Sequence, residues 1–227
     1  LDCQVLLFNN EIYGLTKGQY SPTSRVGTRS PSTPFGSVDR PVSPCGFALG
    51  SNARFVARAI DVHKNLPAVL KAAHAHKGAS FIEIFQNCIV YNDDVFANFT
   101  EKKVAAENQI WVEHGQPALF ANGTKGIRLD RDDLKLHVVD VEGGDWQAAG
   151  VLVHDQSNRG VAKMLIDMSV ENGMPVALGV IYNNPAPTFE SAIVEQSAEA
   201  SKGKKADLQA LIAKGQSWQV GKEPRPA

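Results

Sequence analysis

Two consecutive asparagines begin the stretch of this sequence that is richest in groups able to bind a ligand. Asn9 and Asn10 follow an apolar run at residues 4–8, and the loop after them contains Gly14 and Gly18. An amide oxygen is a neutral hard ligand that suits Mg²⁺, an ion usually shared with phosphates. Glycines allow the backbone of such a loop to approach a diphosphate closely, with N–H groups pointing toward it. The loop therefore indicates a site for a metal-bound diphosphate; the alternative is an ordinary Asn-Asn turn before a surface loop.

Three other groups of reactive side chains favour structural roles when each is taken alone. Cys88 follows the apolar run at residues 80–85, and a single cysteine in such a place is most often a small buried hydrophobe. His74 and His76 are two residues apart on a predicted helix, so their rings should point apart on a solvated face. The charged run at residues 128–133 is typical of solvated surface.

The elements expected around the two asparagines form a parallel sheet. Residues 4–8 predict a buried strand, and residues 54–60 and 80–85 predict two more. Apolar residues at helical spacing predict an amphipathic helix over residues 62–75 between the last two. A strand, a helix and a strand in this order favour a βαβ crossover. The asparagines should then lie at the carboxyl edge of the sheet, where open α/β folds bind ligands.

The rest of the chain predicts an α/β fold, with a mostly parallel sheet flanked by helices. Of the 25 residues from Ser21 to Cys45, 16 are Ser, Thr, Pro or Gly, which indicates a long loop that is either functional or a disordered linker. The further expected elements are helices at residues 101–108 and 159–171, a hairpin at 117–129, strands at 135–141 and 175–182, and a charged helical tail at 191–215.

Composition excludes several classes of protein. The 227 residues carry 23 basic and 24 acidic side chains, a balance that argues against a nucleic-acid-binding protein. No apolar run approaches the roughly 20 residues of a membrane-spanning helix. Three widely spaced cysteines argue against a disulfide framework and for a reducing cytoplasm. The sequence starts at Leu1 inside an expected strand, so we expect an amino-terminally truncated chain.

The stretch NNEIYGLTKGQYSPTS resembles the thiamine-diphosphate-binding segment of the β subunits of 2-oxoacid:ferredoxin oxidoreductases, which typically read N-x-x-YGLTxGQxSPT. The resemblance continues through HKNLPAVLKAAHAHKGASFIEIFQNCIVYND and covers roughly residues 4–95. It implies a thiamine-diphosphate-binding fold that is incomplete at its amino terminus. Residues 1–100 would be the carboxyl-terminal part of the cofactor domain, 101–190 an extension of the same subunit, and 191–227 the charged tail.

The resemblance also assigns site residues. Asn10 would give a side-chain ligand to Mg²⁺ and Ile12 a backbone carbonyl ligand, while a second metal ligand of the family, in an upstream GDG triplet, is absent from this sequence. Cys88 would be one of the four ligands of a [4Fe-4S] cluster, with Cys3 and Cys45 as non-ligands. The residues expected to line thiamine diphosphate are Tyr13, Gly14, Leu15 and Thr16. The family's acid/base residue lies on another subunit, so no catalytic residue is expected here.

The implied activity is oxidative decarboxylation of a 2-oxoacid to acyl-CoA and CO₂ with reduction of ferredoxin. The pairs Asn87-Cys88 and Asn92-Asp93 are more similar to the 2-oxoglutarate branch than to the pyruvate branch. The implied partners are the α subunit, ferredoxin, the 2-oxoacid and coenzyme A, with no nucleic acid and no membrane, in the cytoplasm. The alternatives are a pyruvate:ferredoxin oxidoreductase β subunit and a non-catalytic α/β binding domain.

Overall fold

The computed structural model describes residues 1–215 and residue 220. The described chain divides into two compact units, Leu1–Thr188 and the part that begins at Phe189. No helix among the described residues is long and apolar enough to cross a membrane. Residues 216–219 and 221–227 of the expected tail lie outside the description.

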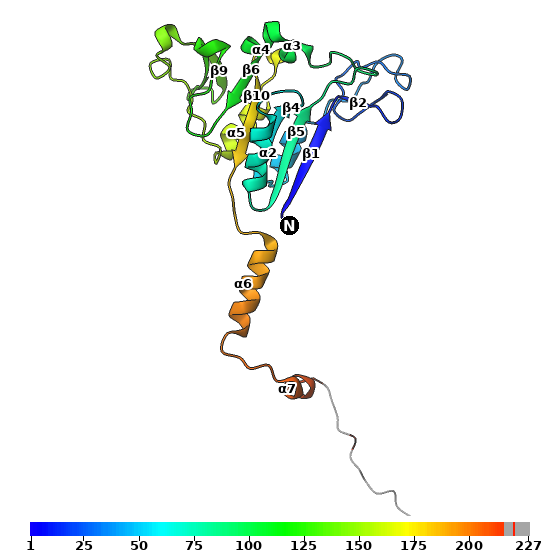
Figure 1. The fold of residues 1–227 in the computed structure, drawn as a ribbon, viewed down its shortest axis with the longest axis vertical. Helices are drawn as coiled ribbons and strands as arrows, with labels where there is room; N and C mark the ends of the chain where they lie inside the picture. The colour runs from blue at the N-terminus through cyan, green and yellow to red at the C-terminus, as the bar shows by residue number, and fades with distance from the viewer. Residues whose placement is uncertain (216–219, 221–227) are drawn as a thin grey trace, which may run out of the picture. The chain divides into compact units, whose positions relative to one another are not determined.

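A five-stranded sheet forms the centre of the first unit, in the order β1-β5-β4-β10-β6 (Figure 1). The strands β1, β5 and β4 are mutually parallel, β10 is antiparallel to β4, and β6 is parallel to β10. The α/β fold with a mostly parallel sheet is therefore confirmed. The bounds are Cys3–Asn9 for β1, Phe55–Ile60 for β4, Ala79–Phe85 for β5, Gln109–Val112 for β6 and Val176–Asn183 for β10.

Helices cover both faces of this sheet. Successive side chains of a strand point to opposite faces. Phe55 and Ala57 of β4 pack with Val69 of α2 (Leu66–Ala75), whereas Val56 packs with α1 (Pro44–Gly50) and α5 (Arg159–Ile166). The helix α2 thus covers one face, and α1 and α5 cover the other.

Smaller elements surround the sheet. The predicted hairpin is confirmed: its two strands, together with the predicted strand after it, form a three-stranded antiparallel sheet in the order β7-β8-β9. The remaining elements of the first unit are β2 (Ile12–Tyr13), β3 (Gln19–Tyr20), α3 (Ala97–Thr100), α4 (Lys102–Asn108), β7 (Leu119–Phe120), β8 (Lys125–Leu129), β9 (Leu136–Asp140) and the 3₁₀ turns Ala121–Gly123, Glu142–Gly144 and Val170–Asn172.

Several expected elements differ from those observed. The first strand was expected to be buried, but β1 is an edge strand that pairs with no described strand except β5, so Val5 and Phe8 are 48% and 58% exposed. The helix expected from residue 62 begins at Leu66, because Pro67 is tolerated only in the first turn of a helix. The strand β6 and the helix α3 were missed, since four-residue elements give little periodicity.

The Ser/Pro-rich loop ends in a helix that was not expected. Ser43 accepts a hydrogen bond from the N–H of Gly46 and Pro44 occupies the first turn, a common way for a helix to start. Cys45 therefore lies in α1, not in a loop, and is completely buried. The prediction that Cys45 lies in the loop was therefore wrong. Its side chain is part of the hydrophobic core.

The second unit contains α6 (Phe189–Ser201) and α7 (Leu208–Ala213). A helical tail was predicted over residues 191–215, and the two helices confirm its helical character. The predicted continuity is wrong, because Gly203 adopts a left-handed conformation with φ of 72° between them. Neither helix has a buried residue.

Candidate functional site

The two asparagines lie where β1 ends, at the carboxyl edge of the sheet. The neighbouring strand β5 ends at Phe85, and the N–H of Gln86 donates to the carbonyl of Asn9 at 2.9 Å. Two segments therefore meet here. We call residues 9–18 the asparagine loop and residues 86–94, which include Cys88, the cysteine turn.

Asn9 has a structural role within the protein interior. Its side chain is buried and its Nδ2 donates to Glu83 Oε1 at 2.8 Å. Its Oδ1 accepts from the N–H of Glu11 at 3.1 Å and from Thr23 Oγ1 at 2.8 Å. An amide oxygen has two lone pairs. Both are used, so Asn9 has no acceptor left for a metal ion.

Asn10, in contrast to Asn9, keeps an acceptor that could bind a metal ion. Its Nδ2 donates to Gln86 Oε1 at 3.0 Å. Within the described residues its Oδ1 accepts one hydrogen bond, from the N–H of Ile12 at 3.2 Å. One lone pair of a half-buried amide oxygen therefore remains at the edge of the sheet. These residues fit an Mg²⁺ ion on Asn10 rather than on Asn9.

The asparagine loop continues as the small hairpin of β2 and β3. The N–H groups of Lys17 and Gly18 donate to the carbonyls of Gly14 and Tyr13, each at 3.0 Å. Gly18 adopts a φ of 88°, and a Cβ there would lie 2.9 Å from Cδ1 of Tyr91. Glycine is thus required at this position both for conformation and for space.

The remaining predicted cofactor residues lie in the same hairpin. Ile12 is buried in β2 beside Tyr20. Tyr13 is half exposed and Leu15 is 99% exposed, while Thr16 is exposed with Oγ1 donating to the Tyr13 carbonyl at 3.4 Å. The fold brings Tyr13 through Thr16 together with Asn10, and their cofactor roles stay predictions.

Cys88 is half-buried and has a free thiol in the cysteine turn. Its carbonyl accepts from the N–H of Asn92 at 2.9 Å, and Asn92 Nδ2 donates to the carbonyl of Asn10, also at 2.9 Å. Asn87 Nδ2 donates to Asp93 Oδ1, and Asn87 Oδ1 accepts from the N–H of Asp94. The structure thus places Cys88 beside the asparagine loop.

Sequence reasoning missed a buried polar cluster next to Asn9. Arg58 and Glu83 lie opposite each other in β4 and β5, and Arg58 Nε is 2.8 Å from Glu83 Oε2. Cys45 Sγ donates to the same oxygen at 3.3 Å. Burial raises the pKa of the Cys45 thiol, with the Glu83 charge adding to the rise. Burial alone would lower the pKa of Arg58, but its interactions with Glu83 and Cys45 together outweigh burial, so the pKa is raised.

One signal could have revealed this cluster. Each of the two apolar runs, RFVARAI and SFIEIF, carries one charged residue near its middle. Opposite charges inside two buried strands are rarely left unpaired. The pair therefore indicates that the two strands are neighbours in this register.

A cavity of about 640 Å³ adjoins the cluster on the face covered by α1 and α5. Asn9, Glu11 and Glu83 line it together with aromatic rings such as Phe96. Burial raises the pKa of Glu11 to about 7, and the guanidinium of Arg25, whose Nε is 3.1 Å from Oε2, opposes part of that rise. The acidic side chains of the cavity wall thus face cationic partners inside the protein.

The two histidines of α2 do not share one solvated face. His74 is exposed, as expected, but His76 is only 4% exposed. The helix ends at Ala75, and His76 adopts an extended conformation that brings its ring to 5.4 Å from that of Phe55. Its Nδ1 lies 2.9 Å from Oδ1 of Asn183. Helical spacing was the wrong guide, because His76 lies beyond the helix.

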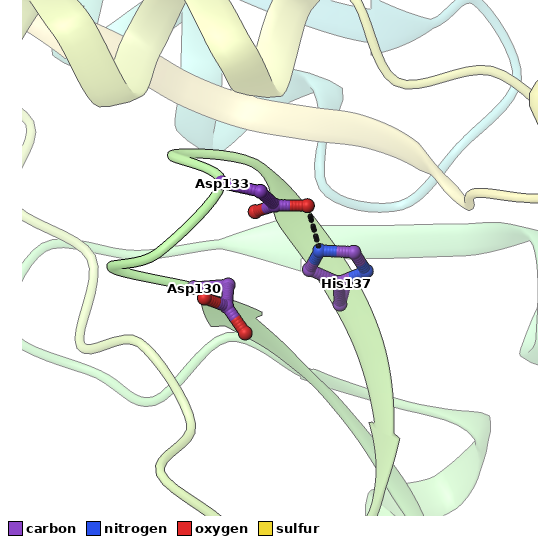
Figure 2. Close-up of side chains that lie close together, drawn as sticks. All are labelled: Asp130, Asp133 and His137. Atoms are coloured by element: carbon purple, nitrogen blue, oxygen red, sulfur yellow. Dashed lines mark hydrogen bonds and ion pairs between the residues drawn. The ribbon is translucent and has the colours of Figure 1, made fainter.

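A second group of candidate metal ligands consists of Asp130 and Asp133 in the turn between β8 and β9 and of His137 in β9 (Figure 2). His137 Nε2 is 2.9 Å from Asp133 Oδ2, and Arg128 Nη2 is 3.8 Å from Asp130 Oδ2. Backbone N–H groups of Asp132 and Lys135 bind the remaining carboxylate oxygens. Existing contacts therefore satisfy this group, in agreement with the solvated charge predicted for residues 128–133.

Several known proteins are similar to this chain. Residues 1–84 match the family described as thiamine pyrophosphate enzyme, C-terminal TPP binding domain. The chain is 38% identical over 227 residues to the 2-oxoglutarate oxidoreductase subunit KorB of Mycobacterium tuberculosis, an alignment that covers 97% of this chain and 60% of that protein. It is 43% identical over 105 residues to the 2-oxoacid:ferredoxin oxidoreductase 1 subunit beta of Aeropyrum pernix, covering 46% of this chain and 33% of that one.

A solved structure shares the fold. The 2-oxoglutarate:ferredoxin oxidoreductase from Magnetococcus marinus, with 2-oxoglutarate, coenzyme A and succinyl-CoA bound, matches with a TM-score of 0.64 at 24% identity over 95% of this chain and 59% of its own. The chain thus spans about 60% of the length of the mycobacterial relative. The alignment with the mycobacterial protein runs along nearly all of this chain, and the chain is thus similar to β subunits of 2-oxoacid:ferredoxin oxidoreductases.

Proposed function

We propose that this chain is the thiamine-diphosphate-binding part of a 2-oxoacid:ferredoxin oxidoreductase. The reaction is oxidative decarboxylation of a 2-oxoacid to acyl-CoA and CO₂, with electrons passed to ferredoxin. The observation that carries the proposal is the free lone pair on Asn10 Oδ1 at the start of a glycine-containing loop. The family match over residues 1–84 supports the same cofactor.

The proposed roles follow the positions of the side chains. Asn10 Oδ1 and the Ile12 carbonyl are ligands of the Mg²⁺ that accompanies the diphosphate. The residues that line the cofactor are Tyr13, Gly14, Leu15 and Thr16. Thiamine diphosphate supplies the carbanion chemistry of decarboxylation, while the protein binds and orients it. In this chain Asn9 fixes the backbone from which those ligands project.

Cys88 is proposed as one ligand of a [4Fe-4S] cluster. A four-iron cluster needs several thiolates converging from separate loops. Among the described residues Cys45 is enclosed in the core beside Glu83, which makes it unsuitable. The described residues therefore do not hold a cluster by themselves, and the other thiolates have to come from outside them.

The favoured substrate is 2-oxoglutarate. The supporting observation is that the mycobacterial relative and one from Methanocaldococcus jannaschii are both named for 2-oxoglutarate. The further partners are an α subunit, coenzyme A and ferredoxin. Three free cysteines are consistent with the reducing cytoplasm as the location.

The test is cofactor binding by the complete αβ enzyme. Asn10→Ala removes one oxygen ligand, so the affinity for thiamine diphosphate in the presence of Mg²⁺ should fall by about 1–3 kcal/mol, as expected for a lost polar contact. Calorimetric titration of the cofactor-stripped enzyme measures it. Asn65→Ala is the matched control, because the Asn65 side chain makes no capping hydrogen bond at α2.

Two results would contradict the proposal. If the Asn10→Ala enzyme binds the cofactor as tightly as the wild type does, Asn10 is not a ligand of the Mg²⁺. A wild-type enzyme that reduces a viologen dye with pyruvate but not with 2-oxoglutarate would remove the substrate assignment.

A further inference from the structure

We propose that Asn92 and Tyr91 are positioning residues for the cofactor, because they fasten the asparagine loop to the cysteine turn. The inference rests on the proposed function, since it concerns the shape of the loop that offers the Mg²⁺ ligand. It adds two residues from a different part of the sequence, about 80 positions beyond Asn10, to those that determine how tightly the cofactor is held.

Asn92 joins the two segments through its side chain. Its Nδ2 donates to the backbone carbonyl of Asn10 at 2.9 Å in a partly buried position. The backbone N–H of Asn92 in turn donates to the Cys88 carbonyl at 2.9 Å, which fixes the residue within its own turn. Asn92 is thus bound through its side chain to the asparagine loop and through its backbone to the cysteine turn. It restrains the residue whose side-chain oxygen is free for the metal ion.

Tyr91 restrains the same loop by packing. A Cβ at Gly18 would lie 2.9 Å from Cδ1 of the Tyr91 ring, and one at Gly14 would lie 3.9 Å from Cδ2. The ring therefore lies against the backbone of Gly18, where a side chain would overlap it. At Gly14 the ring is farther away, and a Cβ there would make an ordinary van der Waals contact with it. The tyrosine thereby limits the conformations of the hairpin expected to contact the diphosphate.

Gln86 completes the attachment. Its N–H donates to the Asn9 carbonyl at 2.9 Å and its Oε1 accepts from Asn10 Nδ2 at 3.0 Å. The asparagine loop is therefore held at several points by one turn before any cofactor binds. A site whose ligands are already ordered loses less entropy on binding. Loosening this turn should weaken cofactor binding even though Asn92 and Tyr91 are not assigned as ligands.

The test compares variants of the complete αβ enzyme after removal of its cofactor. Asn92→Asp preserves the shape but replaces the donor by an oxygen that faces the Asn10 carbonyl. Its Kd for thiamine diphosphate should rise about tenfold, the effect of one lost hydrogen bond. The Mg²⁺ concentration for half-saturation should rise with it. Asn65→Ala is again the control and should leave both values unchanged.

Tyr91 provides an independent arm. Tyr91→Ala removes the ring and should raise the Kd by a similar factor of about ten. Tyr91→Phe keeps the ring on Gly14 and Gly18 and should bind the cofactor as the wild type does. The melting temperature of each cofactor-free variant is measured in parallel. A purely structural role would lower that temperature and leave the cofactor and Mg²⁺ affinities unchanged.

The outcomes separate this inference from the proposed function. If Asn92→Asp and Tyr91→Ala bind the cofactor normally while Asn10→Ala does not, the positioning role is wrong and the proposed function stands. If Tyr91→Phe is as weak as Tyr91→Ala, ring packing is not the cause. A wild-type enzyme that takes up no thiamine diphosphate contradicts the proposed function itself.

Discussion

The two cysteines that follow the asparagine loop have opposite surroundings. Cys88 is half-buried in a turn, whereas Cys45 is enclosed beside Arg58 and Glu83. If Cys88 is a ligand as proposed, Cys88→Ser should abolish the proposed iron–sulfur cluster and leave thiamine diphosphate bound, because serine is a poorer ligand for iron than a thiolate. The cluster absorbance and the bound cofactor, measured on the complete enzyme, check this.

Cys45→Ser is the matched comparison, and burial changes what it should do. The cluster should remain, but the free energy of unfolding should fall by about 1 kcal/mol because a fully buried side chain is altered. Chemical denaturation measures the loss. Cluster loss in this variant would mean that the ligand had been assigned to the wrong cysteine.

The Arg58–Glu83 pair is a buried ion pair that should be costly to break. Glu83→Gln would leave the buried Arg58 guanidinium without a counter-charge, so the free energy of unfolding should fall by about 3–5 kcal/mol. Glu107→Gln is the control, because its pair with Lys125 has the same 2.8 Å separation but is exposed. It should cost less than about 1 kcal/mol. Equal losses in urea denaturation would contradict this difference.

Among the strands, β10 contains a position that only glycine can occupy. Gly179 adopts a φ of 101°, and a Cβ there would lie 2.6 Å from the carbonyl oxygen of Val112 in β6. Gly179→Ala should therefore lower the free energy of unfolding by about 3 kcal/mol through strain and overlap. Gly50→Ala, at the end of α1, meets no atom within 4 Å and should be nearly neutral. Thermal unfolding of the two variants checks the contrast.

The strand β1, which leads into the asparagine loop, lies at the edge of the sheet. Among the described residues β1 pairs only with β5, and it exposes part of an apolar surface that includes Val5, Leu6 and Phe8. Exposed edges of this kind are ready to pair with further chain. The asparagine loop is thus supported on one side by the sheet and by the cysteine turn.

The stability of the first unit as a whole should depend on pH through His154. This ring is 1% exposed, and its Nε2 donates to the Val180 carbonyl at 3.0 Å. Its Nδ1 has no hydrogen-bond partner among the described residues. Burial lowers the pKa of His154, with only partial opposition from the Val180 carbonyl and Asp155. Protonation would create an unpaired cationic N–H in the interior.

The sign follows from the direction of that shift. Below the unfolded pKa of about 6.5 the unfolded chain binds a proton that the folded chain does not, so the free energy of unfolding should fall as the pH decreases. His154→Gln keeps a donor for Val180 but does not titrate. The difference between the denaturation curves of wild type and variant from pH 7.5 to pH 5 measures the effect. Parallel curves would show that His154 is not responsible.

The sequence by itself determined the features that depend on neighbouring residues. The strands at residues 54–60 and 80–85 are near-continuous apolar runs, and the asparagine loop is recognisable from one stretch of residues. Even the late start of α2 at Leu66 could have been predicted from Pro67, because a proline ring clashes with the backbone of any helical turn that comes before it. Periodicity and turn chemistry are local, so the sequence displays them directly.

Only the tertiary structure decided which distant residues meet. It placed Cys45 against Glu83, brought Asn92 onto the carbonyl of Asn10, and left the free lone pair on Asn10 rather than on Asn9. These contacts depend on strand order and on the register between β1, β4 and β5. Side-chain periodicity specifies which face of a strand is buried, but not which strand lies beside it. Residues about 80 positions apart become neighbours only when the sheet is assembled.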